Sequence, residues 1–233
     1  LASAIAAQTG GASRIELCSA LSEGGLTPSA GTISQVRKLL SHGIFVMIRP
    51  RAGNFVYSAN DFDIMLKDIF TACELGADGI VTGILNPDGT VDVVRTRQLV
   101  EAASPLPVTF HRAFDLTPDP YKALEEIITC GCKRILTSGQ QSKAIDGQEL
   151  IYKLIRQAGE RIIIMPGSGV NEQNVADLIR TTGAKEVHLS GRKKISTNHN
   201  TIRKGMDEAS FIQMHETDPL LIQRVIQEAN SIL

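Results

Sequence analysis

Seven short apolar runs, each ending in polar or glycine residues, recur along the chain at roughly regular intervals. They are RIELC (14–18), VMIRPR (46–51), IVTG (80–83), VTFHRAFD (108–115), ILTSG (135–139), IIMPGSG (163–169) and VHLSG (187–191). The stretches between them carry apolar residues at helical spacing. Strands that alternate with helices predict a parallel sheet covered by helices. In that construction the chemistry gathers at the carboxyl ends of the strands, where these polar tips lie.

The helical stretches show apolar residues at positions i, i+3, i+4 and i+7, the spacing of one buried stripe. Asp61 is predicted to cap a helix whose stripe runs from Phe62 to Cys73. Asp119-Pro120 has the residues typical of a helix start, because proline fits the first helical turn. Further helices are predicted over 147–158, from Asn171 and from Asp218.

A repeated helix ending indicates how the chain begins. Gly-small-polar triplets precede several strands, and one of them, Gly11-Ala12-Ser13, lies near the first residue. Residues 1–10 are therefore expected to form the back half of a crossover helix, which needs a strand before it. We expect that strand upstream of Leu1 and absent from this chain.

Eight strands predict an α/β fold of the (β/α)8 TIM-barrel type, with residues 1–233 as a single domain. A doubly wound open sheet is the alternative, but the dinucleotide fingerprint Gly-x-Gly-x-x-Gly is missing. Residues 192–217 are polar and weakly periodic. They are predicted to form a long loop over the barrel mouth or at an oligomer contact.

Side chains alternate along a strand, so parity indicates which of them face the barrel interior. Residues such as Ile15, Leu17, Val108 and Phe110 suit the helix side. Their neighbours are then predicted to point inward: Glu16, Cys18, Arg49, His111, His188 and Ser190. Parity gives no answer for ILTSG.

Two of these residues are candidates for acid–base catalysis. His111 lies at a strand tip beside Arg112, and Glu16 is a carboxylate facing the same interior. The alternatives are structural: Glu16 with Arg49 as a buried ion pair, and His188 as a hydrogen-bonded interior histidine.

The glycine-rich tips favour an anionic ligand. Glycines at a strand end free backbone N–H groups, and a following helix adds its dipole. With the expected first strand counted, 167–169 and 190–192 are the tips of strands seven and eight, where barrels often bind phosphate. The predicted ligand-binding residues are Arg49, Arg51, Arg112, Ser138, Gly139, Gly167, Ser168, Gly169, His188 and Ser190.

Composition narrows the classes of partner. The formal net charge is −1, which argues against nucleic acid or an anionic membrane surface as the partner. No apolar run approaches the roughly 18 residues that span a bilayer. The four cysteines do not form a disulfide framework, so a reduced cytoplasmic setting is expected. Cys130 and Cys132 are interpreted as incidental structural thiols.

The same tips resemble the copper homeostasis protein CutC family. The matching blocks, in order, are RIELCSALSEGGLTPSAG, RPRAGNFVYS, GADGIVTGILNPDGTVD, PVTFHRAFD, RILTSG, PGSGVN and EVHLSGR, across residues 1 to about 192. The chain departs from the family pattern at Ala52 and Asn54, where the family usually has glycine and aspartate.

The resemblance implies a TIM-type barrel, a cytoplasmic location, a homo-oligomer (dimer or tetramer) and copper as the ligand. Cu(I) prefers thiolate and thioether ligands, which makes Cys18 the candidate metal ligand, whereas the same residue taken alone suits a small apolar filler. The alternative function is a barrel enzyme for an anionic, phosphorylated or carboxylated small metabolite, with His111 and Glu16 as acid and base. A third is a non-catalytic oligomeric scaffold.

Overall fold

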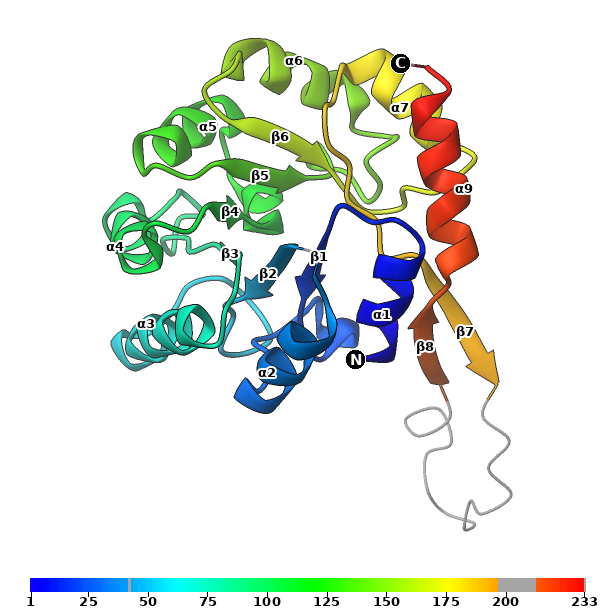
Figure 1. Cartoon of the computed structure of the whole chain (residues 1–233). Helices are drawn as coiled ribbons and strands as arrows, with labels where there is room; N and C mark the ends of the chain where they lie inside the picture. Colours follow the sequence, from blue (N-terminus) through cyan, green and yellow to red (C-terminus); the bar gives the residue numbers. More distant parts are fainter. Residues whose placement is uncertain (42, 197–212, 233) are drawn as a thin grey trace, which may run out of the picture.

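Six short parallel strands form the centre of the protein. The computed structural model describes residues 1–41, 43–196 and 213–232. The strands are hydrogen-bonded in chain order, and the sheet curls into a half-barrel (Figure 1). They are β1 (Arg14–Leu17), β2 (Gly43–Met47), β3 (Gly79–Thr82), β4 (Val108–Phe110), β5 (Arg134–Thr137) and β6 (Ile163–Pro166).

Helices cover the outer face of this curl (Figure 1). They are α1 (Ala2–Thr9), α2 (Ala30–Leu39), α3 (Ala59–Glu74), α4 (Val93–Ala103), α5 (Pro120–Thr129), α6 (Gln148–Ala158), α7 (Val175–Thr182) and α9 (Pro219–Asn230), with short 3-10 turns η1 (Leu21–Glu23) and η2 (Arg112–Leu116). The predicted α/β class is confirmed. The helix expected over residues 1–10 is also present.

The helix starts follow local side-chain chemistry. Asp119 accepts from two backbone N–H groups at the start of α5, directly before Pro120. Asp61 is not the cap of α3 as predicted: Ser58 is, and Asp61 forms the other half of a capping box. The helix expected from Asn171 begins at Val175.

The strand predicted over 187–191 is wrong: the structure assigns no strand to this segment. Its His188 N–H donates to the Pro166 carbonyl at 2.8 Å, which continues the sheet edge by one hydrogen bond. Among the described residues no second bond of that kind extends the pairing, so a regular ladder does not form. The described strands therefore make a half-barrel and not a closed ring of eight.

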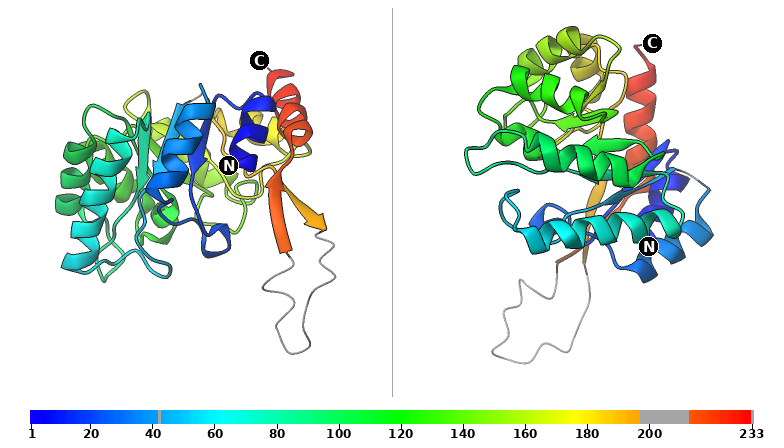
Figure 2. Two further views of the ribbon diagram at one scale, coloured as in Figure 1. Left: turned by 60° about the horizontal axis from the view of Figure 1, so that its bottom comes forward. Right: turned by 90° about the vertical axis from the view of Figure 1, so that its left-hand side faces the viewer.

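The polar segment 192–217, predicted as a loop, has paired ends. Residues 192–196 and 213–217 form an antiparallel hairpin of β7 (Arg192–Ser196) and β8 (Gln213–Thr217). Figure 2 shows this hairpin projecting from the body of the molecule beside α1 and α9. Residues 197–212 lie outside the described residues.

The curl separates two apolar clusters. The larger one lies between the strands and the helices and contains Ile44, Ile80 and Phe110. The smaller one lines the inner face and consists of Phe45, Met47 and Val81, with Cys18 packed against it. Helix-side and inward positions thus alternate along the strands, as parity predicts.

One carboxylate links the amino ends of two strands, β1 and β5. Arg14 at the start of β1 and Arg134 at the start of β5 both pair with Glu186. Both guanidinium groups also lie over the Phe45 ring, at 5.4 Å from its centroid. Gly79 leaves the room for that ring, because a Cβ there would come within 2.3 Å of it.

Candidate functional site

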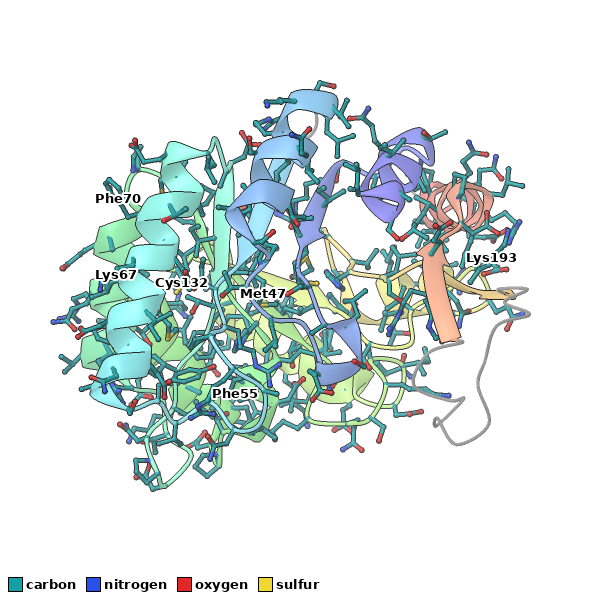
Figure 3. The ribbon with its side chains drawn as sticks, turned by 90° about the horizontal axis from the view of Figure 1, so that it is seen from below. Met47, Phe55, Lys67, Phe70, Cys132 and Lys193 are labelled. Carbon is teal, nitrogen blue, oxygen red and sulfur yellow. The ribbon has the colours of Figure 1, made fainter. Side chains whose placement is uncertain are left out.

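Two sulfur atoms face the inside of the curl near the tip of β1. Cys18 follows β1 directly, and Met47 ends β2, where it is almost fully buried (Figure 3). Gly25 lies against both: a Cβ at this position would stand 3.4 Å from Cys18 Sγ and 3.6 Å from Met47 Cε. The Cys18 thiol and the Met47 thioether methyl group therefore lie against the same position of the backbone.

Ionisable groups surround the Cys18 thiol. Burial raises its pKa to about 12; the Glu16 charge adds to the rise and Arg192 opposes it. Glu16 Oε2 lies 4.0 Å from His188 Nδ1. The structure therefore brings Glu16, Cys18 and His188 together at one side of the mouth, as predicted for inward-facing residues.

Arg49 does not form the buried ion pair with Glu16 that the sequence left as an alternative. Its Nη1 donates to the carbonyls of Glu23 and Gly25 at 2.6 and 3.0 Å, and its Nη2 donates to Gly53 at 2.9 Å. Among the described residues Glu16 pairs with His188, not with Arg49. Arg49 thus fixes two loops to the end of β2.

The loop of residues 50–58 crosses the tip of β2. Arg51 shapes it by donating to the Ala52, Asn54 and Val56 carbonyls and to Asp61 Oδ2. The two departures from the family pattern fit this loop. Ala52 has no positive φ, whereas the following glycine has φ 88°, and the Asn54 side chain accepts from Arg51 Nη2 at 3.3 Å.

His111 is a buried, neutral histidine at the tip of β4. Its Nδ1 accepts from the Ala113 N–H at 3.2 Å, so the ring proton resides on Nε2. Burial, followed by the Arg49 charge, lowers the pKa of His111 to about 3. The ring lies over Gly83, where a Cβ would come within 2.5 Å of Nδ1, and 4.7 Å from the Phe55 ring centroid.

This geometry makes His111 a hydrogen-bond donor at neutral pH. A base that takes up a proton only near pH 3 has little proton affinity in the range where enzymes work. His111 Nε2 is buried and has no hydrogen-bond partner among the described residues.

A third polar group lies between the tips of β4 and β5. Arg112 donates to Asp115 Oδ2 and to Ser138 Oγ, both at 2.8 Å. Asp115 also accepts from the backbone N–H groups of Ser138 and Gln140, at 3.1 to 3.2 Å. These mutual bonds order the β5 tip. Gly139 lies against the backbone of Gly147: a Cβ added to Gly139 would stand 2.8 Å from the Gly147 Cα.

The glycine-rich tip after β6, residues 167–169, is closely surrounded by other side chains. A Cβ on Gly167 would meet Leu136 at 2.5 Å and His188 at 3.2 Å, and one on Gly169 would meet the Lys143 side chain at 3.0 Å. Ser168 has φ 81° and donates from Oγ to the Ser142 carbonyl at 2.8 Å.

Ser190 belongs to the junction with the hairpin, because its carbonyl accepts from Thr217 Oγ1 at 3.4 Å. The phosphate site at the tips of 167–169 and 190–192 stays a prediction.

Sequence reasoning missed several residues of the mouth. Phe55 and Tyr57 come from the 50–58 loop, which lies outside every strand, and Gly25 comes from a turn after β1. Clusters of at least three His, Cys, Asp or Glu residues able to hold a metal ion do not occur within the described ranges. No helix in those ranges is long and apolar enough to cross a membrane.

The comparisons of this sequence with known proteins all point to one family. The sequence model of the CutC family matches residues 1–193. A CutC family protein of Xanthomonas campestris pv. campestris strain 8004 is 52% identical over 194 residues, which are 83% of this chain and 81% of that protein. One of Bacteroides thetaiotaomicron is 46% identical over 233 residues, covering 99% of this chain and 94% of that protein.

A solved structure agrees with the sequence matches. It is a Streptococcus agalactiae CutC protein, whose name assigns it provisionally to copper homeostasis. It is 39% identical to this chain, with a TM-score of 0.73, and covers 76% of this chain and 87% of its own.

Proposed function

The chain belongs to the CutC family, and from that premise we propose that it serves copper homeostasis by binding Cu(I) between Cys18 and Met47. The observation that carries this proposal is that the Cys18 thiol and the Met47 thioether side chain lie together against Gly25 on the inner face of the curl. Thiolate and thioether are the ligands that select Cu(I).

The charges of the site suit a monovalent ion. Cu(I) with one thiolate is neutral overall, which agrees with the apolar cluster of Phe45, Met47 and Val81 behind the thiol. The Cys18 proton must leave when the metal binds. Glu16 lies next to this thiol, with His188 4.0 Å from its carboxylate, so a proton acceptor is at hand.

The test is a competition titration of the whole chain with Cu(I) against a chromophoric Cu(I) chelator. We expect one equivalent to bind, Cys18→Ser to abolish that binding, and Met47→Leu to weaken it while preserving the volume of the side chain. Cys73→Ser is the matched control, because Cys73 is a half-buried thiol on α3. Equal affinities in the wild type and Cys18→Ser would overturn the proposal.

A second candidate function is an enzyme that acts on an anionic, phosphorylated or carboxylated small metabolite. It is favoured by Arg49, a buried guanidinium at the mouth, and by His111, a buried donor for which the described residues offer no acceptor. Glu16 is the proposed acid–base residue, paired with His188, while His111 polarises the substrate by donating from Nε2. Arg112, Ser138 and the glycine tips would hold the rest of the anion.

The second function is tested by incubating the protein with mixed phosphorylated and carboxylated metabolites and following their consumption by NMR. We expect a metabolite to be consumed by the wild type and left intact by Glu16→Gln. Full consumption by Glu16→Gln would remove Glu16 from the reaction, and consumption by neither protein would count against an enzyme.

The setting we propose is a cytoplasmic homo-oligomer. The four cysteines, all within the described residues, are free thiols, as expected in a reducing compartment. A dimer or tetramer is the assembly expected, and light scattering on the whole chain measures it directly.

A further inference from the structure

Within the described residues, Arg49 is a buried positive charge that forms no ion pair with a carboxylate. The residue is only 5% exposed, and the partners of its guanidinium group are backbone carbonyls. Its Nη atoms donate to backbone carbonyls, but Nε is buried and has no hydrogen-bond partner there. A buried charge without its opposite is costly, so this arrangement indicates a ligand that brings a negative charge.

Two neutral donors share this location. Tyr57, 4% exposed, has a buried hydroxyl beside Arg49: burial raises the pKa of Tyr57, while the charge of Arg49 and a hydrogen bond from it oppose that rise. The hydroxyl oxygen thus accepts from Arg49, and its O–H proton meets no acceptor among the described residues. His111, also 4% exposed, has its donor Nε2 unpartnered in the same way. Phe55 connects the group: the Arg49 guanidinium lies 5.0 Å over its ring, and the His111 ring is 4.7 Å away.

We propose that Arg49, Tyr57 and His111 bind the carboxylate of a small organic acid beside the Phe55 ring. This proposal rests on the second candidate function, because it concerns the same barrel mouth. It names organic carboxylates as the substrate class of that function. It is independent of the Cu(I) proposal, because none of the three side chains supplies a sulfur ligand.

The charge at this location favours a monoanion such as a carboxylate over a phosphate dianion. One guanidinium supplies a single positive charge, and the two neutral donors match the lone pairs of two oxygens. A phosphate dianion would leave one negative charge buried without an opposite charge beside it.

Entry to this site requires the 50–58 loop to move. Phe55 and Tyr57 both belong to that loop, which crosses the strand tips (Figure 3). The loop is held to the rest of the protein by the bonds from Arg49 Nη2 to the Gly53 carbonyl at 2.9 Å, from the Leu85 N–H to the Phe55 carbonyl at 2.9 Å and from Arg95 Nη1 to the Tyr57 carbonyl at 2.8 Å, and Arg51 adds bonds within it. None of these bonds belongs to the ladder of the sheet, so the loop can move while the strands stay paired.

The test uses acetate and formate as probes, with phosphate and sulfate at matched ionic strength, on the whole chain labelled with 15N at histidine. We expect saturable binding of acetate with a downfield shift of the His111 Nε2 proton, because that proton gains an anionic acceptor. Tyr57→Phe removes one hydroxyl without changing the ring and should weaken acetate about tenfold or more. Tyr121→Phe, on the exposed surface of α5, is the matched control and should bind acetate like the wild type.

Several outcomes would overturn the inference. Equal acetate affinity in Tyr57→Phe and the wild type would show that the hydroxyl does not contact the ligand. Phosphate or sulfate shifting the His111 proton as strongly as acetate would show that the site does not select carboxylates. A crystal grown in acetate with only an ordered water on Nε2 would show that water satisfies the donor.

The two proposals for the mouth can fail separately. Consumption of a phosphorylated metabolite by a protein that ignores acetate would keep the second candidate function and remove the carboxylate site. Acetate binding without any metabolite consumption would keep the carboxylate site and remove the second candidate function.

Discussion

His111 and Cys18 are the two side chains at the mouth whose protonation depends most on burial. Burial keeps His111 neutral and Cys18 protonated, because a charge on either would lie away from water. The residue types alone suggested a general acid or base and a metal-binding thiolate. Sequence cannot give these protonation states, because they depend on burial and on distant charges: Arg49 for His111 and Arg192 for Cys18.

The neutral state of His111 makes the fold sensitive to acid. The unfolded chain binds a proton at a pKa near 6.5, whereas folded His111 does so only near pH 3, so stability falls as the pH drops through this window. By pH 4 the loss should amount to about 3 kcal/mol. Urea unfolding of the wild type and His111→Gln at several pH values checks this: the variant should lose less stability between pH 6.5 and 4. Parallel pH profiles would contradict it.

Cys18 is expected to react slowly with alkylating reagents in the metal-free protein. A pKa of about 12 in place of 9.0 makes the thiolate fraction at pH 8 about a thousandfold smaller than for a free thiol. Mass spectrometry of the Cys18 peptide after timed iodoacetamide treatment measures the rate. Alkylation as fast as that of a cysteine in the urea-unfolded chain would show that the thiol is not protected.

Among the elements, β3 shows how glycine positions make room for the interior. Gly79 at its start accommodates Phe45, and Gly83 after its end accommodates His111. Neither requires a positive φ. The sequence marks both residues as strand boundaries, but only the packing shows that neighbouring strands fill the space of their missing side chains.

Gly83→Ala is therefore expected to destabilise the protein by about 1–3 kcal/mol. The added methyl group would lie within 2.5 Å of His111 Nδ1 and 3.2 Å of the Ala113 Cβ, and the buried ring packs between Phe55 and Phe110, which must shift if it moves. Gly31→Ala in α2 is the control, because its nearest neighbour is 3.9 Å away and alanine favours a helix. Chemical denaturation of both variants should give opposite signs; a stabilised Gly83→Ala would contradict the account.

The accuracy of the predicted elements follows from how local their signals are. The helices were predictable because their apolar stripes and caps lie within a few residues, although Ser58 and not Asp61 caps α3. The strand over 187–191 failed because strand formation depends on a neighbour along its whole length, and this segment makes one bond to Pro166. The hairpin ends at 192–196 and 213–217 were missed, since 16 residues separate them.

At the scale of the whole molecule, Glu186 links the two sides of the curl. Arg14 is 172 positions away in sequence and Arg134 is 52 positions away, so no local pattern could predict this cluster. Burial raises the pKa of Glu186, but hydrogen bonds from Arg134 and Arg14 outweigh it and hold the pKa below its usual range. The carboxylate thus stays charged between its two partners.

Removing that charge should loosen the curl. Glu186→Gln leaves the two guanidinium groups beside Phe45 without their shared carboxylate and is expected to cost about 2 kcal/mol, less than a fully buried pair because the groups are partly exposed. Glu160→Gln is the control, since Glu160 is 95% exposed and 3.8 Å from Lys185. The urea midpoint of each variant measures its loss of stability. Equal midpoints for Glu186→Gln and Glu160→Gln would show that the cluster does not hold the strands together.

Copper bound between Cys18 and Met47 should be visible by X-ray absorption at the copper edge of the Cu(I)-loaded chain. We expect a first coordination shell made of two sulfur atoms. One of them should be lost in Met47→Leu, and the sulfur signal should disappear in Cys18→Ser. A first shell of nitrogen and oxygen atoms alone, or an unchanged spectrum in Cys18→Ser, would contradict it.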